Sequence, residues 1–564
     1  MNKWRALMQQ LRNFIIRLSI THLVLLTITV LPGIQFKDAL FRVWIASLVF
    51  VILTAVLRPV LVALLLPLTI VSAGLFLFVI DGFLLLLTDW LTGLEIASFG
   101  WAILGSVVMG VMNIWVQSAF KRLGWMERTD EDDPPEILSP GWGLRILLGG
   151  GLLFGLALGV MAAFQVVLAL STLISNLRIL GVVGLLSLVG IAFTVAWLVA
   201  EGLEANNRAR FSLIATIMTV SVTTIGLVVI FSLPKPAVKV PPPPPNVQYW
   251  SLPTGSRIAY YAYPAQGEIQ ETPIVYLHDG PGMAVLDAER EFYRRFAEDG
   301  FDVYLYDRIG VGHSGRLEQI SAYGLERDLA DLDAIRDELG VNEMILIGQG
   351  AGAELAARYL GRYPERVTRA IFHSPTPLAD DAAFFDNYAR TGAPLGPNPV
   401  FEPRLLLAAA LAGYGPEAAE NIASQAEMSV LLAEAFTPQL WVCGRHSALA
   451  PEIDAAGATF NYYVQVQIEL SEQTLPDPRP ALDENLTPSL VLAAECDYIP
   501  WGVIQQYQET LLNEKVIYFE GAGHMIQLTQ GGALGATIRA FLLEEPYPIS
   551  PYEGPGNPRP MLGP

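Results

Sequence analysis

Long apolar runs fill the first 245 residues of this 564-residue chain and then stop. Most of the runs are close to the roughly 20 residues that an α-helix needs to cross a bilayer. This pattern restricts the first part of the chain to membrane-spanning helices, and we expect seven spans and a multi-pass protein of the cell membrane. The runs cover residues 13–33, 40–57, 60–88, 101–120, 146–171, 179–200 and 211–232.

Basic residues predict the orientation of these spans. They lie at the start of the first run, between the fourth and fifth runs, and between the sixth and seventh, so the positive-inside rule places these three positions in the cytoplasm. Seven spans from a cytoplasmic N-terminus put everything after residue 232 outside the cytoplasm. No small-residue cleavage site follows the first run, which therefore does not read as a signal peptide. The basic residues are Lys3, Arg5, Arg12, Arg17, Lys121, Arg122, Arg128, Arg145, Arg208 and Arg210.

The remainder of the chain has the composition of a soluble domain and is strongly acidic. It carries 43 of the 55 acidic residues but only 19 of the 35 basic ones. This charge excludes nucleic acid as a partner, because a polyphosphate would be repelled. The two cysteines, Cys443 and Cys496, are too few for a disulfide framework and fit no zinc spacing, so we expect no metal and no cofactor.

Short apolar runs alternate with helical stretches from Tyr249 onward, which is typical of an α/β fold with a mainly parallel sheet. Each expected strand ends in a polar or Gly-rich loop, and ligand chemistry belongs at such strand ends. The expected segments are a four-span membrane module (1–120), a cytoplasmic acidic loop (121–145), three further transmembrane helices (146–232), a Pro-rich linker (233–248), the α/β domain (249–545) and a Pro/Gly-rich, irregular tail (546–564). Pro241 to Pro245 favour a stiff polyproline II linker.

Short motifs in the membrane half carry a family resemblance. The segments Leu31–Ile34, Leu57–Leu61 and Leu66–Thr69 resemble the four-span membrane family named after phage holins. The resemblance implies an integral membrane module, with the lipid bilayer as its partner. Asp81 is costly in apolar surroundings, and we interpret it as facing a helix partner rather than as part of a transport path.

Motifs in the soluble half resemble the α/β-hydrolases, and within them the prolyl iminopeptidase-like group, over about residues 250–543. His278-Asp279-Gly280-Pro281-Gly282 resembles the oxyanion loop of that group, His-Gly-Gly-Pro-Gly. Two further segments match the family, Tyr306–Ser314 before the nucleophile and Arg362–Val367 after it. The resemblance implies backbone N–H donors at Gly280 and Ala351 facing a developing oxyanion, and His278 orienting the loop.

The same resemblance assigns an acid and a base. Asp497 occupies the acid position and His524 the histidine position, in the chain order that this fold uses. In such a site the histidine accepts the proton of the nucleophile, and the acid holds the ring and stabilises its cation. The pair can also survive only as a buried contact between two loops.

The nucleophile itself is missing. Gly348-Gln349-Gly350-Ala351-Gly352 keeps the glycines of the G-x-S-x-G elbow, but Gly350 stands in the serine position. A second departure is Asp279, which replaces a loop glycine and whose carboxylate would disfavour a nearby anion.

Three hypotheses about function remain open from the sequence. In the first, the domain is weakened or inactive and binds a small molecule or peptide. In the second, it is a serine-independent hydrolase of peptide, amide or ester bonds that has recruited another nucleophile or a water activated by His524. In the third, His524 and Asp497 act as a general base without a covalent step. Ser314 and Ser374 end strands but do not occupy the elbow, and Cys496 is expected to be a packed small residue.

An insertion at about residues 375–473 occupies the place of the helical cap that sets specificity in the family. In iminopeptidases, acidic residues of the cap receive the free amine of the substrate. The insertion carries Glu402, Glu417, Glu420, Glu427 and Glu434, most of which are expected to face solvent.

Overall fold

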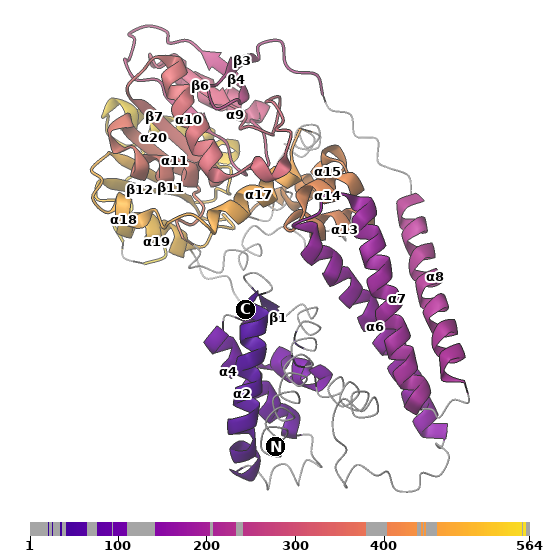
Figure 1. Cartoon of the computed structure of the whole chain (residues 1–564). Helices are drawn as coiled ribbons and strands as arrows, with labels where there is room; N and C mark the ends of the chain where they lie inside the picture. The colour runs from indigo at the N-terminus through magenta and orange to yellow at the C-terminus, as the bar shows by residue number, and fades with distance from the viewer. Residues whose placement is uncertain are drawn as a thin grey trace, which may run out of the picture. The chain divides into compact units, whose positions relative to one another are not determined.

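The computed structural model divides the chain into two compact units, Met1–Ser232 and Leu233–Pro564. Each unit is described by itself below (Figure 1). The structure describes Thr21, Leu25 and residues 34–36, 41–64, 76–92, 94–96, 98–109, 142–202, 207–232, 241–379, 403–436, 441–443, 445–446, 459–554 and 556–559.

The first unit contains a helical pair closed by a short sheet. Helix α2 (Phe41–Leu64) packs against α4 (Phe76–Thr92). Strands β1 (Ile34–Phe36) and β2 (Leu94–Ile96) pair antiparallel. The sequence separates the apolar runs 40–57 and 60–88, but α2 continues from the first run into the second. The second run is therefore divided between the end of α2 and most of α4.

An ion pair lies between these two helices. Arg58 Nε lies 2.8 Å from Asp81 Oδ1, and Arg58 Nη2 donates to Asp81 Oδ2 at 2.9 Å. This ion pair offsets part of the cost of placing a carboxylate among apolar helices. Asp81 therefore has a helix partner, as the sequence suggested.

Three long helices follow in the same unit: α6 (Trp142–Ser171), α7 (Leu177–Gly202) and α8 (Arg208–Ser232). Glycines allow α6 and α7 to approach closely, because a Cβ on Gly155 would lie 2.8 Å from Val195 Cγ1. Among the described residues, two helices are long and apolar enough to cross a bilayer, Leu177–Glu201 and Arg208–Val228. The count of seven spans stays a prediction.

The second unit is built on an eight-stranded sheet in the order β12-β11-β8-β7-β5-β6-β4-β3. The six strands from β12 to β6 are parallel, and β4 and β3 continue the sheet antiparallel. This confirms the expected mainly parallel α/β fold. The strands are β3 (Gln248–Ser251), β4 (Arg257–Tyr263), β5 (Ile274–Leu277), β6 (Val303–Tyr306), β7 (Met344–Gln349), β8 (Val367–His373), β11 (Ser489–Ala494) and β12 (Glu514–Phe519).

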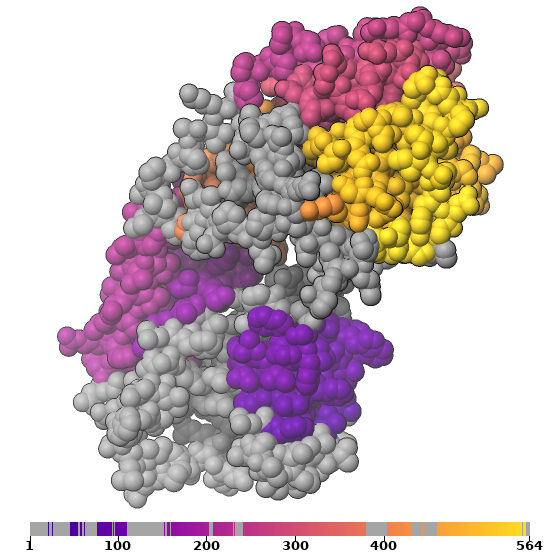
Figure 2. Space-filling model, turned by 180° about the vertical axis from the view of Figure 1, so that it is seen from behind, coloured from indigo at the N-terminus to yellow at the C-terminus, as the bar shows by residue number. Residues whose placement is uncertain are grey.

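Alternating strand residues bury both faces of the sheet. One set packs with apolar side chains of α9 (Asp287–Tyr293) and α20 (Ile526–Leu543). The alternate set faces other helices, as the contact of Phe372 with Tyr507 of α19 (Trp501–Thr510) shows. Helices α10 (Leu325–Leu339) and α11 (Ala351–Arg362) pack together. The C-terminal part of the chain, coloured yellow, gathers on one side of this unit (Figure 2).

The described part of the insertion between β8 and β11, called the cap below, is mainly helical. Its described elements are α13 (Pro403–Ala412), α14 (Pro416–Ile422), α15 (Gln425–Phe436), β9 (Trp441–Val442), β10 (Arg445–His446) and α17 (Tyr462–Glu472). Within it, Arg404 donates to Glu427 at 2.6 Å, and both side chains are buried.

A disulfide joins Cys443, in the turn between β9 and β10, to Cys496 in the loop after β11. The expectation that Cys496 is merely a packed residue is therefore wrong. The two cysteines are 53 residues apart in sequence, and the folding back of the cap brings them together. The bond fastens the cap to the loop that carries Asp497.

The described residues on either side of the α/β domain, at the end of the linker and in the tail, are irregular, as expected. In the described part of the linker, Val247 N donates to Pro244 O at 3.1 Å, so a turn separates the prolines from β3. The tail packs along the domain: Tyr552 N donates to Val516 O at 2.7 Å, and Arg559 donates to the Ile499 carbonyl.

We predict that Arg58→Leu lowers the stability of the full chain in detergent by on the order of 3 kcal/mol, because it leaves Asp81 charged among apolar helices without its partner. The double variant Arg58→Leu/Asp81→Leu should recover most of this loss. Thermal unfolding measures both effects, and Arg178→Leu serves as the control for losing an exposed arginine. Equal losses in the single and double variants would contradict the role of the pair.

Candidate active site

The strand-turn-helix elbow is present, with Gly350 at its tip between β7 and α11. Its φ of 52° and ψ of −119° lie outside the regions that L-residues favour, and glycine adopts them without a steric penalty. Gly348 and Gly352 are required by close packing, because a Cβ on either would overlap neighbouring backbone. The backbone of a strand-turn-helix elbow is thus formed, and Gly350 brings no side chain to its tip.

The space above Gly350 is filled by the carboxylate of Asp279. A Cβ built on Gly350 would overlap Asp279 Oδ1. A side chain at position 350 and Asp279 in its present position therefore exclude one another. Gly350 and Asp279 are the two departures from the family pattern, and the structure couples them because they share one space.

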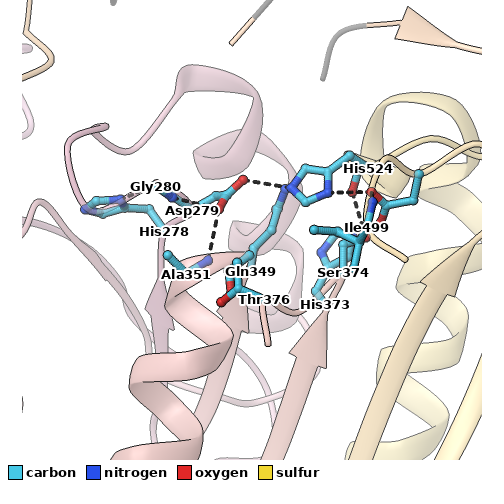
Figure 3. A network of polar contacts seen from close by, with 12 residues as sticks. His278, Asp279, Gly280, Gln349, Ala351, His373, Ser374, Thr376, Ile499 and His524 are labelled. Atoms are coloured by element: carbon cyan, nitrogen blue, oxygen red, sulfur yellow. Dashed lines mark hydrogen bonds and ion pairs between the residues drawn. The ribbon is translucent and has the colours of Figure 1, made fainter. Parts of the chain in front are cut away.

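Asp279 also occupies the two N–H donors assigned to the oxyanion hole (Figure 3). Its Oδ1 accepts hydrogen bonds from Gly280 N at 2.7 Å and from Ala351 N at 3.0 Å. Its Oδ2 lies 2.8 Å from His524 Nε2. One carboxylate therefore fills the space beside Gly350, accepts from both backbone donors and contacts His524.

The acid and base come together as the sequence predicts. His524 follows β12, and its Nδ1 lies 2.9 Å from Oδ1 of Asp497, which follows β11. Ile499 N donates to the same Asp497 oxygen at 3.0 Å. His524 is 1% exposed, so its ring is enclosed between two carboxylates.

These contacts determine the charge of each group. Burial alone would lower the pKa of His524, but the charges of Asp497 and Asp279 raise it to about 10. Burial alone would raise the pKa of Asp279 and of Asp497, but the charge of His524 and hydrogen bonds to the carboxylates lower both below their usual range. At neutral pH the site holds an imidazolium between two carboxylates.

The nearby polar residues have structural contacts. His278 Nδ1 donates to the Asp279 carbonyl at 2.9 Å, and its Nε2 accepts from Arg308 N at 3.3 Å. Burial lowers the pKa of His278 to about 3, so the ring is neutral and orients the oxyanion loop. Ser374 Oγ donates to the His524 carbonyl at 2.9 Å, and Ser314 Oγ accepts from Ala259 N at 2.8 Å. Both hydroxyls thus contact the backbone.

The cap glutamates named from the sequence make contacts with other protein groups where the structure describes them. Glu427 pairs with Arg404, and Glu417 accepts from the hydroxyl of Ser321 at 2.7 Å. Burial and the charge of Glu417 raise the pKa of Glu420. Glu402 and the side chain of Glu434 lie outside the described residues.

Sequence reasoning missed two acids of α17. Glu469 and Glu472 lie three positions apart on this helix, and Glu472 also lies near Glu354 in the first turn of α11. Burial, followed by the charges of Glu354 and Glu469, raises the pKa of Glu472 to about 9. The same helix contacts the oxyanion loop, where Gly282 N donates to Gln465 Oε1 at 2.9 Å. The spacing of the two glutamates was the available signal.

No group of three His, Cys, Asp or Glu residues suited to a metal ion is found within the described ranges.

Two family models match the chain. Residues 12–115 match the family described as "Mycobacterial 4 TMS phage holin, superfamily IV", and residues 272–530 match the "alpha/beta hydrolase fold" family. The structure of the proline iminopeptidase from Mycobacterium smegmatis aligns with 53% of this chain and 98% of its own, at 18% identity and a TM-score of 0.39.

Curated relatives match each half. The proline iminopeptidase of Heyndrickxia coagulans is 33% identical over 122 residues, which is 22% of this chain and 41% of that protein. The uncharacterized membrane protein YvlD of Bacillus subtilis is 41% identical over 75 residues, 13% of this chain and 63% of that protein. The chain spans about two fifths of the length of the first proline iminopeptidases that it matches. It thus joins a phage-holin-family membrane module to an α/β-hydrolase-fold domain related to proline iminopeptidases.

Proposed function

We propose that this chain is a membrane-tethered hydrolase-fold protein whose soluble domain binds a small molecule or peptide and has lost serine-type hydrolysis of acyl bonds. The observation that carries the proposal is the Asp279 carboxylate in the place of the serine and of the oxyanion. The relatives named proline iminopeptidase suggest a ligand with peptide character.

The same geometry disfavours serine-independent hydrolysis of peptide, amide or ester bonds. A substrate carbonyl has no donor at Gly280 N or Ala351 N while Asp279 accepts from both. Each such donor is typically worth a factor of about 10² to 10³ in acyl transfer. His524 holds its proton at neutral pH, so it lacks the lone pair that a general base needs for a water or a substrate.

For the membrane half, we infer a multi-pass arrangement with the soluble domain outside the cytoplasm. The basic residues of the loops support this orientation. The disulfide between Cys443 and Cys496 supports it independently, because disulfides persist in oxidising compartments and are rare in the cytosol.

A prediction about hydrolysis concerns the pair Asp279 and Gly350. Gly350→Ser alone should stay inactive, because its Cβ collides with Asp279, and Asp279→Gly alone should stay inactive, because no nucleophile is present. The double variant Asp279→Gly/Gly350→Ser should hydrolyse aminoacyl-amide or short-chain ester reporters roughly 10³-fold faster than either single variant, since it restores a complete triad and an empty oxyanion hole.

The control for this gain is the triple variant that also carries His524→Ala, which should lose it. All variants are compared as the full chain in detergent, with thermal unfolding as the test of folding. Hydrolysis by the natural chain at the rate of the double variant, abolished by His524→Ala, would overturn the proposed function.

The second prediction concerns pH. Because the pKa of His524 is raised from 6.5 to about 10, its contribution to stability is fully present below pH 6.5 and is lost as the pH rises toward 10. The lowered pKa values of Asp279 and Asp497 give contributions that are present above pH 3.8 and are lost in more acidic solution. The site therefore stabilises the fold most between pH 3.8 and 6.5.

The measurement is the thermal unfolding midpoint of the natural chain and of Asp279→Asn from pH 3.8 to about pH 10. The single proton on His524 changes the free energy of unfolding by at most about 1.4 kcal/mol per pH unit. The natural chain should lose stability more steeply above pH 6.5 than Asp279→Asn, and other titrating groups cancel in the difference. Parallel curves would contradict the ion pair.

The third prediction concerns the compartment. The chain has two cysteines, so a maleimide polymer added to cells dissolved directly in denaturant should label it only after reduction, at two positions. Cys443→Ser should expose one free thiol without reduction. Two free thiols in the natural chain before reduction would place the domain in the cytoplasm.

A further inference from the structure

The tail carries a buried arginine. Tyr552 N donates to Val516 O of β12 at 2.7 Å, and the Tyr552 hydroxyl donates to Gly556 O at 2.7 Å. These two bonds hold the described tail residues against the edge strand of the sheet. Arg559 follows three positions after Gly556 and is only 4% exposed. A buried guanidinium is costly unless an opposite charge compensates it, so its position calls for a partner.

Arg559 lies at the loop that presents the acid of the site. It donates to the Ile499 carbonyl, and its guanidinium carbon lies 5.6 Å from the centroid of the Trp501 ring. The Tyr552 ring meets Trp501 edge-on, with the centroids 5.5 Å apart. The N–H of Ile499 donates to Asp497 Oδ1 at 3.0 Å. The two backbone groups of one loop residue therefore link the tail arginine to the acid.

The charges of the site do not balance without Arg559. Asp279 and Asp497 are negative and His524 is positive, which leaves one negative charge. Asp279 also accepts two N–H groups next to the start of α11, where the helix dipole favours an anion. On the other side of the ring, burial raises the pKa of Asp497, while the charge and hydrogen bond of His524 and then the charge of Arg559 lower it. With Arg559, two positive groups face two negative ones.

We propose that the tail is part of the site, and that Arg559 is a positioning residue that supplies the fourth charge of the buried network and holds the loop of Asp497. The proposal goes beyond the proposed function, because it stands whether or not the domain binds a peptide or hydrolyses acyl bonds. It follows that displacement of the tail leaves the network with a net negative charge and weakens the contact of Asp497 with His524.

The local sequence favours the insertion of an arginine at this position. Pro558 and Pro560 flank Arg559, and prolines leave the unfolded chain fewer conformations to lose. Asn557 Oδ1 accepts from Arg559 N at 3.0 Å, which is the turn that an asparagine side chain forms two residues on. Arginine is also charged at every relevant pH, and its planar group contacts the face of an aromatic ring such as Trp501 while it donates to a carbonyl.

The test is a double-mutant cycle on the full chain in detergent, read by thermal unfolding. Arg559→Gln should lower the unfolding midpoint by roughly 5 °C, because Asp497 stays buried and charged with one partner fewer. In the Asp497→Asn background the same change should lower the midpoint by less than roughly 1 °C or raise it, because there Arg559 is the uncompensated charge. Arg559→Lys keeps the charge and should recover at least about half of the loss.

The control is Arg539→Gln, which removes an exposed arginine that pairs with Asp299 and Glu545. It should have the same effect in both backgrounds. Equal losses from Arg559→Gln in the two backgrounds, or no loss in either, would overturn the proposal. If Arg559→Gln does not fold, the comparison of Asp497→Asn with the double variant decides, because the double variant should be at least as stable.

A pH series separates the charge of Arg559 from its packing. The charged and titratable groups that face Asp497 are His524, Arg559 and His373, whose pKa is lowered to about 3 by burial. The lowered pKa of Asp497 gives stability that is present above pH 3.8 and is lost as the pH falls below it. The difference in midpoint between the natural chain and Arg559→Gln should therefore be constant above pH 3.8 and shrink in more acidic solution. An unchanged difference there contradicts the proposal, while the acyl reporters test the proposed function separately.

Discussion

A buried imidazolium between two buried carboxylates is the interaction on which the soluble domain depends. An isolated carboxylate is very costly to bury, and Asp279 avoids this cost only because His524 supplies the opposite charge and two N–H groups supply hydrogen bonds. The Asp279 carboxylate fits at this position because Gly350 has no side chain. Each member of the arrangement requires the others, since removal of any one leaves a charge, a donor or a volume uncompensated.

The cap is linked to the loops that carry these charged groups. The disulfide fastens its β9–β10 turn to the loop that presents Asp497, and Cys496 N also donates to Ala522 O at 2.8 Å, two residues before His524. The loops of the acid and the base are therefore tied to each other and to the cap. On the other side of the site, Gln465 of α17 contacts Gly282 of the oxyanion loop. The cap holds the surroundings of the charge network in place from both sides.

The first unit also pairs ionised groups among apolar side chains, with one arginine and one aspartate. Arg58 and Asp81 lie on different helices of an apolar pair, and each removes the cost of the other. In both units, ionised groups lie far apart in the sequence and are accepted in low-dielectric surroundings because the fold pairs them. The physical rule is common to the two units, although their folds and surroundings differ.

The sequence by itself determined the two-part organisation, the parallel α/β sheet, and the elbow, acid and base at Gly350, Asp497 and His524, because periodicity and motif order are local properties. It also showed that Asp279 and Gly350 depart from the family pattern. Only the tertiary structure decided that these departures are coupled, that Cys443 pairs with Cys496, and that Arg58 meets Asp81. Each of these facts is a contact between residues distant along the chain, and such contacts are fixed by how the elements pack rather than by any local pattern.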